Sequence, residues 1–413
     1  MARSEELTIL ISGGGPVGLT VAALLAASGA GQRCRIEVIE SGPPPRWDPD
    51  EVDLRVYALS RASQRIFERL RLWAEIERAR ISPYERMHVW QGEEPDGRAA
   101  LRFDSADVGE PDLGHIVEDR LLKHVLFERL ESEPRVGLRT GRAVVAVERR
   151  ARGVTVGLDT GETIDGALLV AADGADSAVR SLFQLPTVAR SYAQQALVAH
   201  VTTELAHRRT AWQRFLPGGP LAFLPLADGR SSIVWSMPDT DAAALLAAPD
   251  GEFLAALQKA SAGVLGRLQA VTPRARFPLQ VMHALRYCCD RGVLVGDAAH
   301  AVHPLAGQGM NLGLADAACL AEEIDAALGR GEHPGDRRVL RRYERRRKAE
   351  NLKMLLALDA LHHLFRLPWP VAPLGGLGLA AVDAAPPARR ALMRRALGLD
   401  GDVPQGPPPR AVA

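Results

Sequence analysis

The sequence predicts an α/β fold in which a layered domain of alternating strands and helices carries an inserted mixed or antiparallel β-sheet domain and a helical C-terminal tail. Three observations support this prediction. Strand, glycine turn, helix and strand follow one another over residues 7–40, short strand-like runs with turns fill about 187–285, and helical periodicity dominates from residue 332. Alternating strands and helices favour a parallel sheet, whereas consecutive strands joined by turns favour an antiparallel one.

Size and composition indicate a folded protein of more than one domain. The chain has 413 residues, of which 47% are hydrophobic and 24% charged, and its formal net charge is +1. This balance gives no electrostatic reason to expect nucleic-acid binding. The four cysteines form no CxxC pair and no zinc-type spacing. We therefore expect no metal site, no disulfide framework and a reducing, cytoplasmic compartment.

The apolar stretch at residues 7–30 is expected to be a buried strand and helix, not a signal peptide or an anchor. Three glycines and a proline interrupt it at residues 13–16. Strand 7–12, helix 16–29 and strand 35–40 then form the β-α-β unit that opens a Rossmann-type layer. The other elements expected of this layer are helices at about 60–80, 119–132 and 312–328 and strands at 143–149, 153–159, 167–172 and 292–296.

The inserted sheet is expected to come from two separate segments. Strand-like alternation covers 86–104, and the runs within 195–237 include a hairpin turn at 227–230. The predicted domains are a nucleotide-binding domain formed by 1–85, 105–186 and 286–331, a sheet domain formed by 86–104 and 187–285, and a C-terminal helical region at 332–413 that frays after about residue 401.

A glycine fingerprint follows the first strand. In Gly13-x-Gly15-x-x-Gly18 the first glycine makes a tight turn, the second admits a pyrophosphate and the third packs helix on strand. Glu40 ends the second strand and suits an adenosine ribose. This pattern alone does not separate FAD from NAD. The candidate contacts are Gly13, Gly15, Pro16, Val17, Gly18 and Glu40.

A second cluster follows the strand at 167–172. Asp173-Gly174 ends the strand, Ser177 can cap a helix, and Arg180 stands in the first turn of that helix. On its own the cluster is equally well explained as a capped strand–helix junction. Arg55 and Arg120 are further candidates for neutralising phosphates, although each alone is better explained as a solvated surface arginine.

A third cluster covers residues 296–311. Gly296-Asp297 follows an apolar run, and a turn containing Pro304, Gly307 and Gly309 leads into a helix. Because a helix N-terminus is electropositive, this segment offers a carboxylate for polyol hydroxyls beside N–H groups for an electron-rich ring, which suits a flavin. The candidate contacts are Gly296, Asp297, Gly307, Gln308, Gly309, Met310 and Asn311, with Pro304, Gly307 and Gly309 positioning the ring.

Together the three clusters resemble those of the single-component FAD-dependent aromatic hydroxylases with the p-hydroxybenzoate hydroxylase fold. Residues 303–316, 210–226 with Trp235, and 277–279 narrow the resemblance to the ubiquinone-biosynthesis hydroxylases. The likeness extends from about residue 7 to 365. One small departure is Ala171-Ala172, where relatives often have a glycine before Asp-Gly.

The resemblance implies an enzyme that binds FAD, is reduced by NAD(P)H without a second Rossmann domain, and transfers one oxygen atom of O₂ to a phenolic ring through a flavin C4a-hydroperoxide. It implies that Arg55 lies near the flavin and Arg120 near the ADP portion. No general base is assigned. His300 and His303 are the visible candidates, with Tyr57 and Tyr192 behind them, and a buried structural role is favoured for His300.

Two alternatives remain open from the sequence: a hydroxylase of a small soluble aromatic, and a FAD-binding accessory subunit of a lipid-synthesis complex. A prenylated substrate would bring the enzyme to the inner face of a membrane or to partners of ubiquinone synthesis. The Arg/Lys-rich stretch at 337–353 beside an apolar helix fits peripheral membrane binding. The simpler interpretation is a helix that packs on the FAD domain with an exposed basic face.

Overall fold

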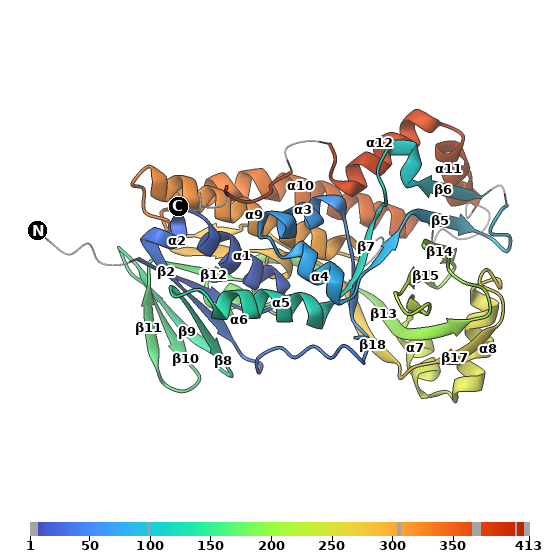
Figure 1. Cartoon of the computed structure of the whole chain (residues 1–413), viewed down its shortest axis with the longest axis horizontal. Coiled ribbons are helices and arrows are strands. Elements are labelled where there is room, and N and C mark those ends of the chain that lie inside the picture. The colour runs from blue at the N-terminus through green and yellow to red at the C-terminus, as the bar shows by residue number, and fades with distance from the viewer. Residues whose placement is uncertain (1–6, 98, 304–306, 366–372, 401–402, 409–413) are drawn as a thin grey trace, which may run out of the picture.

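The computed structural model describes residues 7–97, 99–303, 307–365, 373–400 and 403–408. In Figure 1 the strands β1, β2, β8 and β12 lie toward one end of the molecule and β13–β18 toward the other. Helices α9 (Gln308–Gly329) and α10 (Arg337–Leu364) run beside the first group. The α/β class and the inserted sheet predicted from the sequence are confirmed.

A six-stranded sheet forms the first layer, and all of its strands but the edge strand β19 are parallel. Its strand order is β19-β20-β12-β1-β2-β8. Its central strands are buried on both sides, which explains their continuous apolar runs. The bounds are β1 (Leu7–Ser12), β2 (Cys34–Glu40), β8 (Val136–Thr140), β12 (Leu168–Ala171), β19 (Cys288–Cys289) and β20 (Gly292–Leu294).

Helices cover this sheet and share one apolar core with it. Helix α1 is apolar nearly all round because it packs between the sheet and other helices. The helices of this layer, besides α9, are α1 (Pro16–Ala27), α2 (Ala30–Arg33), α3 (Arg61–Arg69), α4 (Trp73–Ala79), α5 (Asp119–Glu131) and α6 (Ala178–Leu182).

The carboxyl ends of four neighbouring parallel strands carry the predicted motifs. Strand β2 ends at Glu40, β1 leads into Gly13, β12 into Asp173 and β20 into Gly296. Parallel strands present their carboxyl ends at one edge of a sheet, and ligands of open α/β sheets bind at that edge. Residues more than 280 positions apart therefore meet at one place.

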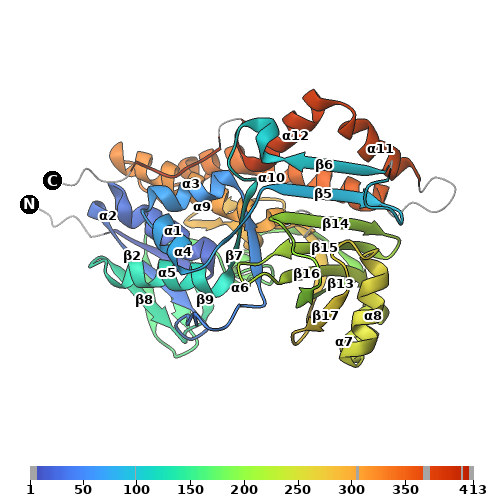
Figure 2. The same cartoon turned by 45° about the vertical axis from the view of Figure 1, so that its right-hand side comes forward.

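A nine-stranded mixed sheet forms the second layer. Its order is β21-β18-β13-β16-β15-β14-β5-β6, with β17 paired to β13. All pairs are antiparallel except that of β5 with β14. Figure 2 shows β5, β6 and β14–β16 as successive strands of this sheet. The bounds are β5 (Arg86–Gln91), β6 (Ala100–Asp104), β13 (Thr187–Thr203), β14 (Thr210–Leu216), β15 (Gly219–Pro225), β16 (Ser231–Pro238), β17 (Leu268–Val271), β18 (Ala275–Ala284) and β21 (His300–Ala301).

Two helices that the sequence analysis did not expect, α7 (Asp239–Ala247) and α8 (Asp250–Ala260), cover one face of this sheet. Side chains of alternate strand residues, such as Leu197, Phe223 and Ile233, pack with them in a separate core. The other face of the sheet is left free for a cavity. The Ala/Leu-rich run at 242–257 has helical character, but the strand-like runs around it predicted no helix in the sheet domain of 187–285.

Smaller elements complete the fold. The apolar pattern at 60–80 forms two helices, because Arg71 breaks it with a left-handed backbone (φ 62°). The remaining elements are strands β3 (Val56–Leu59), β4 (Ser82–Tyr84), β7 (Gly114–Glu118), β9 (Val144–Arg149), β10 (Val154–Leu158) and β11 (Thr163–Gly166), with 3-10 turns at Ser105–Val108 and Gly296–Ala298.

The C-terminal region is helical, with α10 followed by α11 (Pro373–Asp383) and α12 (Pro386–Leu397). Phe365, Leu379 and their neighbours pack against β5, β6 and β14, and Figure 2 shows α11 beside β6. None of the helices in the described part of the chain is long and apolar enough to cross a membrane. The fraying predicted after about residue 401 concerns residues that lie mostly outside the described ranges.

Candidate functional site

One cavity of about 1380 Å³ joins the motif-bearing edge of the first sheet to the free face of the second. Typical single-ligand pockets hold about 300–1,000 Å³. At one end of the cavity lie the glycine turn and the polar ends of the parallel strands. At the other lie small side chains of β13–β16, such as Ala196, Ala222 and Val234. The cavity is therefore large enough for two ligands, one at a polar end and one at an apolar end.

The glycine turn has the shape that a pyrophosphate needs. Gly13 has φ +112°, and a Cβ there would lie 2.3 Å from the carbonyl oxygen of Ala172. A Cβ on Gly18 would lie 2.0 Å from the carbonyl oxygen of Gly13, so helix and strand pack as closely as backbones allow. At Gly15, by contrast, a Cβ would meet nothing within 4 Å, because this residue faces the open cavity.

The start of α1 is left open toward the same space. Gly15 is the N-cap residue and provides no side chain to cap the helix, and Pro16 occupies the first turn. Both residues and Val17 line the cavity. Exposed N–H groups and the positive end of the helix dipole favour a phosphate at this point.

Glu40 holds the glycine turn in place from the neighbouring strand. Its Oε2 accepts a hydrogen bond of 2.5 Å from the backbone N–H of Gly14, and its Oε1 accepts one of 2.7 Å from Gly42. The sequence suggested only a ribose contact for this carboxylate. The structure shows that Glu40 orders two loops while it also lines the cavity.

The second cluster acts partly behind the cavity wall. Asp173 and Gly174 line the cavity, whereas Ser177 is buried and caps α6 by accepting a hydrogen bond from the N–H of Arg180 at 2.9 Å. The Arg180 guanidinium donates to the carbonyl oxygens of Ala175 (2.8 Å) and Ala298 (3.0 Å). Arg180 thus ties the segment after β12 to the segment after β20.

Asp297 presents its carboxylate to the cavity from the turn after β20. Gly296 takes the left-handed φ of +57°, and a Cβ there would lie 3.2 Å from the Val17 side chain. Burial raises the pKa of the Asp297 carboxyl, an effect that His300 and Arg55 partly offset. Its side chain is exposed to the cavity space, so the carboxylate has room to accept hydrogen bonds from the hydroxyls of a ribityl chain.

The start of α9 borders the same part of the cavity. Gly307 has φ +61°, and Gly307, Gly309 and Met310 line the wall. Asn311 lies behind it, where its Oδ1 accepts hydrogen bonds from Ser60 N (2.9 Å) and Ser63 Oγ (2.7 Å). Gln308 also lies outside the lining. Pro304, for which we predicted a ring-positioning role, lies outside the described residues.

Thirteen of the predicted site residues meet at the cavity wall, and six lie behind it. The lining set is Gly13, Gly15, Pro16, Val17, Glu40, Arg55, Arg120, Asp173, Gly174, Asp297, Gly307, Gly309 and Met310. The supporting set is Gly18, Ser177, Arg180, Gly296, Gln308 and Asn311.

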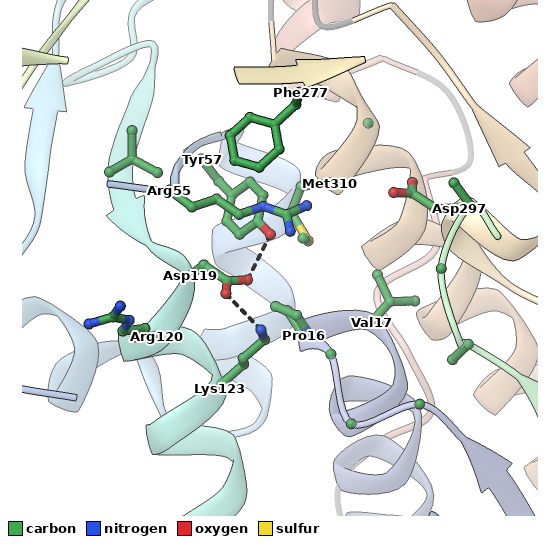
Figure 3. A pocket seen from close by; sticks show the side chains of 18 of the residues that line it. Pro16, Val17, Arg55, Tyr57, Asp119, Arg120, Lys123, Phe277, Asp297 and Met310 are labelled. Carbon is green, nitrogen blue, oxygen red and sulfur yellow. Dashed lines mark hydrogen bonds and ion pairs between the residues drawn. The ribbon is translucent and has the colours of Figure 1, made fainter. Parts of the chain in front are cut away.

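Arg55 differs from Arg120 in its surroundings. Figure 3 shows the Arg55 guanidinium extending over Tyr57 on the side that faces Asp297, and it lies 5.4 Å from the Tyr57 ring centroid. Burial works against the charge of Arg55, but Tyr57 and nearby carboxylates outweigh it and raise its pKa. Arg120 lies at the rim, where it is half exposed and 3.6 Å from Asp53. Arg55 therefore fits a group deep in the cavity and Arg120 one near its mouth.

A polar chain that the sequence did not reveal adjoins Arg55. The Tyr57 hydroxyl donates a hydrogen bond of 2.7 Å to Asp119, which forms an ion pair of 2.7 Å with Lys123. Burial is the main cause that raises the pKa of Tyr57 well above its ordinary value, so its hydroxyl stays protonated. These residues come from β3 and α5, about 60 positions apart, so no local sequence pattern predicts their contact.

A second unexpected network lies behind the turn that carries Asp297. Asp316 of α9 pairs with His300 Nε2 at 2.5 Å and with Arg347 Nε at 2.7 Å, and it accepts a hydrogen bond from Asn351 at 3.0 Å. All four side chains are buried. His300 is thus held in a structural network, as favoured from the sequence. His303 is buried among the rings of Tyr192 and His362, with centroids 5.1 and 4.7 Å away.

These residues fit FAD. The glycine turn leaves room for a pyrophosphate where a Cβ would project. The cavity-facing carboxylate of Asp297 suits ribityl hydroxyls, and the start of α9 offers N–H groups beside the space that remains for the ring. The glycine turn, the carboxylate and the helix start thus match the pyrophosphate, the ribityl chain and the flavin ring of this cofactor.

The chain is similar to known proteins. Residues 6–355 match the family model described as FAD binding domain. The ubiquinone hydroxylase UbiL of Rhodospirillum rubrum is 38% identical to this chain, over 94% of this chain and 89% of that protein. The 3-demethoxyubiquinol 3-hydroxylase of Escherichia coli is 37% identical over 96% of this chain and 100% of that protein. The Drosophila melanogaster ubiquinone biosynthesis monooxygenase COQ6 is 33% identical over 96% and 90%.

Solved structures agree on the fold. The p-nitrophenol 4-monooxygenase PnpA of Pseudomonas putida superposes with a TM-score of 0.78 at 19% identity, over 96% of this chain and 98% of that one. PqsL of Pseudomonas aeruginosa, solved with 2-aminobenzoylacetate, gives 0.73 at 25% identity over 92% and 100%. The sequence resemblance is confirmed: the chain belongs to the FAD-dependent hydroxylases of ubiquinone biosynthesis, within the FAD binding domain family.

Proposed function

We propose that this protein is a FAD-dependent monooxygenase that hydroxylates the ring of a polyprenylated phenol or quinol intermediate of ubiquinone biosynthesis. The observation that carries the proposal is the cavity in which a FAD-fitting edge faces a sheet surface of small apolar side chains. The names of two relatives support the choice of substrate class. One is named a ubiquinone hydroxylase and the other a 3-demethoxyubiquinol 3-hydroxylase, and both align over nearly the whole chain.

The chain itself would bind and orient the cofactor. Gly15 and the first N–H groups of α1 would hold the pyrophosphate, Glu40 the adenosine ribose, and Asp297 the ribityl hydroxyls. Gly309 and Met310 at the start of α9 would border the ring, where N–H dipoles favour negative charge. Bound FAD, reduced by NAD(P)H, supplies the activation of O₂ that amino-acid side chains cannot.

The apolar end of the cavity would take the aromatic ring. Its floor consists of cavity-facing residues of β13, β15 and β16, and Phe277 of β18 lies at its edge, 46% exposed. Burial between the two sheets would keep water from the reacting ring. An exposed aromatic at the rim is suited to contact an apolar chain that leaves the cavity.

A peripheral membrane contact is part of this proposal. Helix α10 exposes Leu352, Leu356 and Leu361. Arg338, Arg341 and Arg345 are exposed on the preceding turns. Other basic residues of the helix are engaged within the chain: Arg342 and Arg346 pair with Glu323, and Arg347 with Asp316. The free arginines and leucines together suit an anionic bilayer surface, from which a prenylated substrate would come.

Mass spectrometry of a gene-deletion strain tests the function. The expected result is loss of ubiquinone with accumulation of a prenylated ring that lacks one hydroxyl, whose structure names the step. Purified protein with FAD, NAD(P)H and a prenylphenol should then yield a hydroxylated product that carries one atom from isotope-labelled O₂. Unchanged quinone content together with efficient hydroxylation of a water-soluble phenol would replace this proposal with a small-aromatic hydroxylase. FAD binding without any turnover would favour an accessory subunit.

A further inference from the structure

The cavity face of the nine-stranded sheet carries mostly apolar side chains. Because strand side chains alternate, the residues opposite the α7–α8 core point to the cavity. Val198, Val234, Ala222 and Gln213 are paired across β13, β16, β15 and β14 and form one row. With strands about 4.8 Å apart, this row spans about 14 Å. Gln213 is therefore the polar end of an otherwise apolar row.

Gln213 presents its side-chain amide to the cavity. It is 7% exposed and lines the cavity, and its amide makes no hydrogen bond within the described ranges of the chain. Ser232 and Ser236, which flank Val234 on β16, also line the cavity and are each 1% exposed. An amide that reaches a mostly apolar cavity without a partner in the described part of the chain presents its donors and its acceptor to a ligand with a complementary group.

The amide of Gln213 is harder to satisfy within its own strand than the hydroxyls of Ser232 and Ser236. A serine can turn its O–H toward a carbonyl of its own strand, whereas a carboxamide carries two donors and one acceptor at a fixed distance from the backbone. Gln195 shows the usual outcome on this sheet, because its amide donates to Asp239 at 3.0 Å. Gln213 has no such neighbour.

We propose that Gln213 is the specificity-determining residue for the ring, and that its amide forms a hydrogen bond with an oxygen substituent of the aromatic substrate. The proposal rests on the proposed function for the presence of such a ring in the cavity. Apolar contacts with Val198, Ala222 and Val234 hold a flat ring but let it rotate in its plane. One hydrogen bond at the end of the row fixes that rotation, and with it the ring carbon that faces the cofactor.

Ligand titration of the FAD-loaded protein tests this proposal without depending on turnover. The probes are 2-prenylphenol and prenylbenzene, which lacks the ring oxygen, and binding is followed by the change in flavin absorbance. The wild type should bind the phenol at least about tenfold more tightly, since a site that pairs a substrate hydroxyl rejects the analogue without it. Gln213→Leu should weaken phenol binding by about that factor and leave prenylbenzene binding unchanged, so that the preference disappears.

Gln195→Leu is the matched control, because it makes the same exchange on the opposite face of the same sheet and should retain the preference. Thermal unfolding of each variant shows whether the fold is kept. Equal weakening of both probes, or a preference that survives in Gln213→Leu, overturns the proposal. Hydroxylation of 2-prenylphenol by the wild type is measured separately: a Gln213-dependent preference without any product supports the contact and contradicts the proposed function.

Discussion

Asp316 accepts a hydrogen bond of 3.1 Å from the backbone N–H of Gly296, so helix α9 is tied directly to the turn that presents Asp297 to the cavity. The same buried carboxylate pairs with Arg347 of α10 and with His300. Burial opposes the charge of Asp316, but His300 and Arg347 outweigh it and lower its pKa to about 2. One acid thereby joins three segments behind the cofactor position.

Replacing this acid should cost both stability and cofactor. Asp316→Asn leaves Arg347 buried without its counter-charge, and removing one partner of a buried pair typically costs about 3–5 kcal/mol. We expect a markedly lower unfolding temperature and weaker FAD retention, measured by thermal unfolding and flavin absorbance. Asp290→Asn, an exposed residue, is the control and should change neither. Wild-type stability at neutral pH in Asp316→Asn would contradict the role.

The pH dependence follows from the lowered pKa of Asp316. A carboxyl whose pKa is depressed by folding contributes stability above its unfolded value, about 3.9, and that contribution is lost as the pH falls through the folded value of about 2. The difference in stability between wild type and Asp316→Asn should therefore shrink as the pH falls below about 4. Denaturant unfolding at several pH values measures this difference.

The glycine turn allows binding to be separated from folding. Gly15→Val places its side chain in open cavity space, so the protein should fold with nearly unchanged stability but lose FAD because the pyrophosphate position is filled. Gly13→Ala should instead destabilise the protein, since its Cβ would collide with the Ala172 carbonyl at an unfavourable φ. Circular dichroism melts and flavin content of both variants give the comparison. An unstable Gly15→Val protein would show that this position supports the fold.

The sequence predicted the motif-bearing edge well because the information there is local. Gly13, Asp173 and Gly296 each follow an apolar run directly, and the parallel order of those runs brings their ends together. It also placed segment 86–104 with the later strands. The same reasoning missed the role of Glu40 as an acceptor for the N–H of Gly14. A glutamate that binds a loop and one that binds a ligand cannot be told apart from the sequence.

Contacts between distant elements could not be predicted in this way. Asp316 and Arg347 lie on different helices, and Tyr57 and Asp119 on a strand and a helix about 60 positions apart. The position of an Asp or Arg in a helical pattern does not reveal which residue of another element it will pair with. The unpaired amide of Gln213 is likewise visible only once β14 is placed in the sheet.

Replacing Asp297 should preserve or raise the stability of the cofactor-free protein but weaken FAD binding. Because burial raises the pKa of this carboxyl, its ionisation at neutral pH costs the cofactor-free protein stability. Asp297→Asn should therefore be at least as stable as wild type without cofactor at pH 7, and this advantage should shrink as the pH falls toward the ordinary carboxyl range, where the wild-type group is protonated. FAD affinity should drop by about tenfold or more, since a charge-assisted acceptor is lost. Full FAD occupancy in the variant would contradict the ribityl assignment.

The exposed face of α10 gives a direct test of membrane contact. Leu352 and Leu356, 37% and 57% exposed, lie one turn apart beyond Arg341 and Arg345. We expect the wild type to sediment with vesicles that contain phosphatidylglycerol and to do so less as salt screens the arginines. Leu352→Glu with Leu356→Glu should abolish sedimentation while FAD content and the unfolding temperature stay near wild type, because neither side chain is part of the core. Leu205→Glu changes a leucine of similar exposure (53%) on the sheet domain and should sediment like wild type. If both proteins lost binding equally, the attraction would reflect net charge, and the α10 face would have no special part in it.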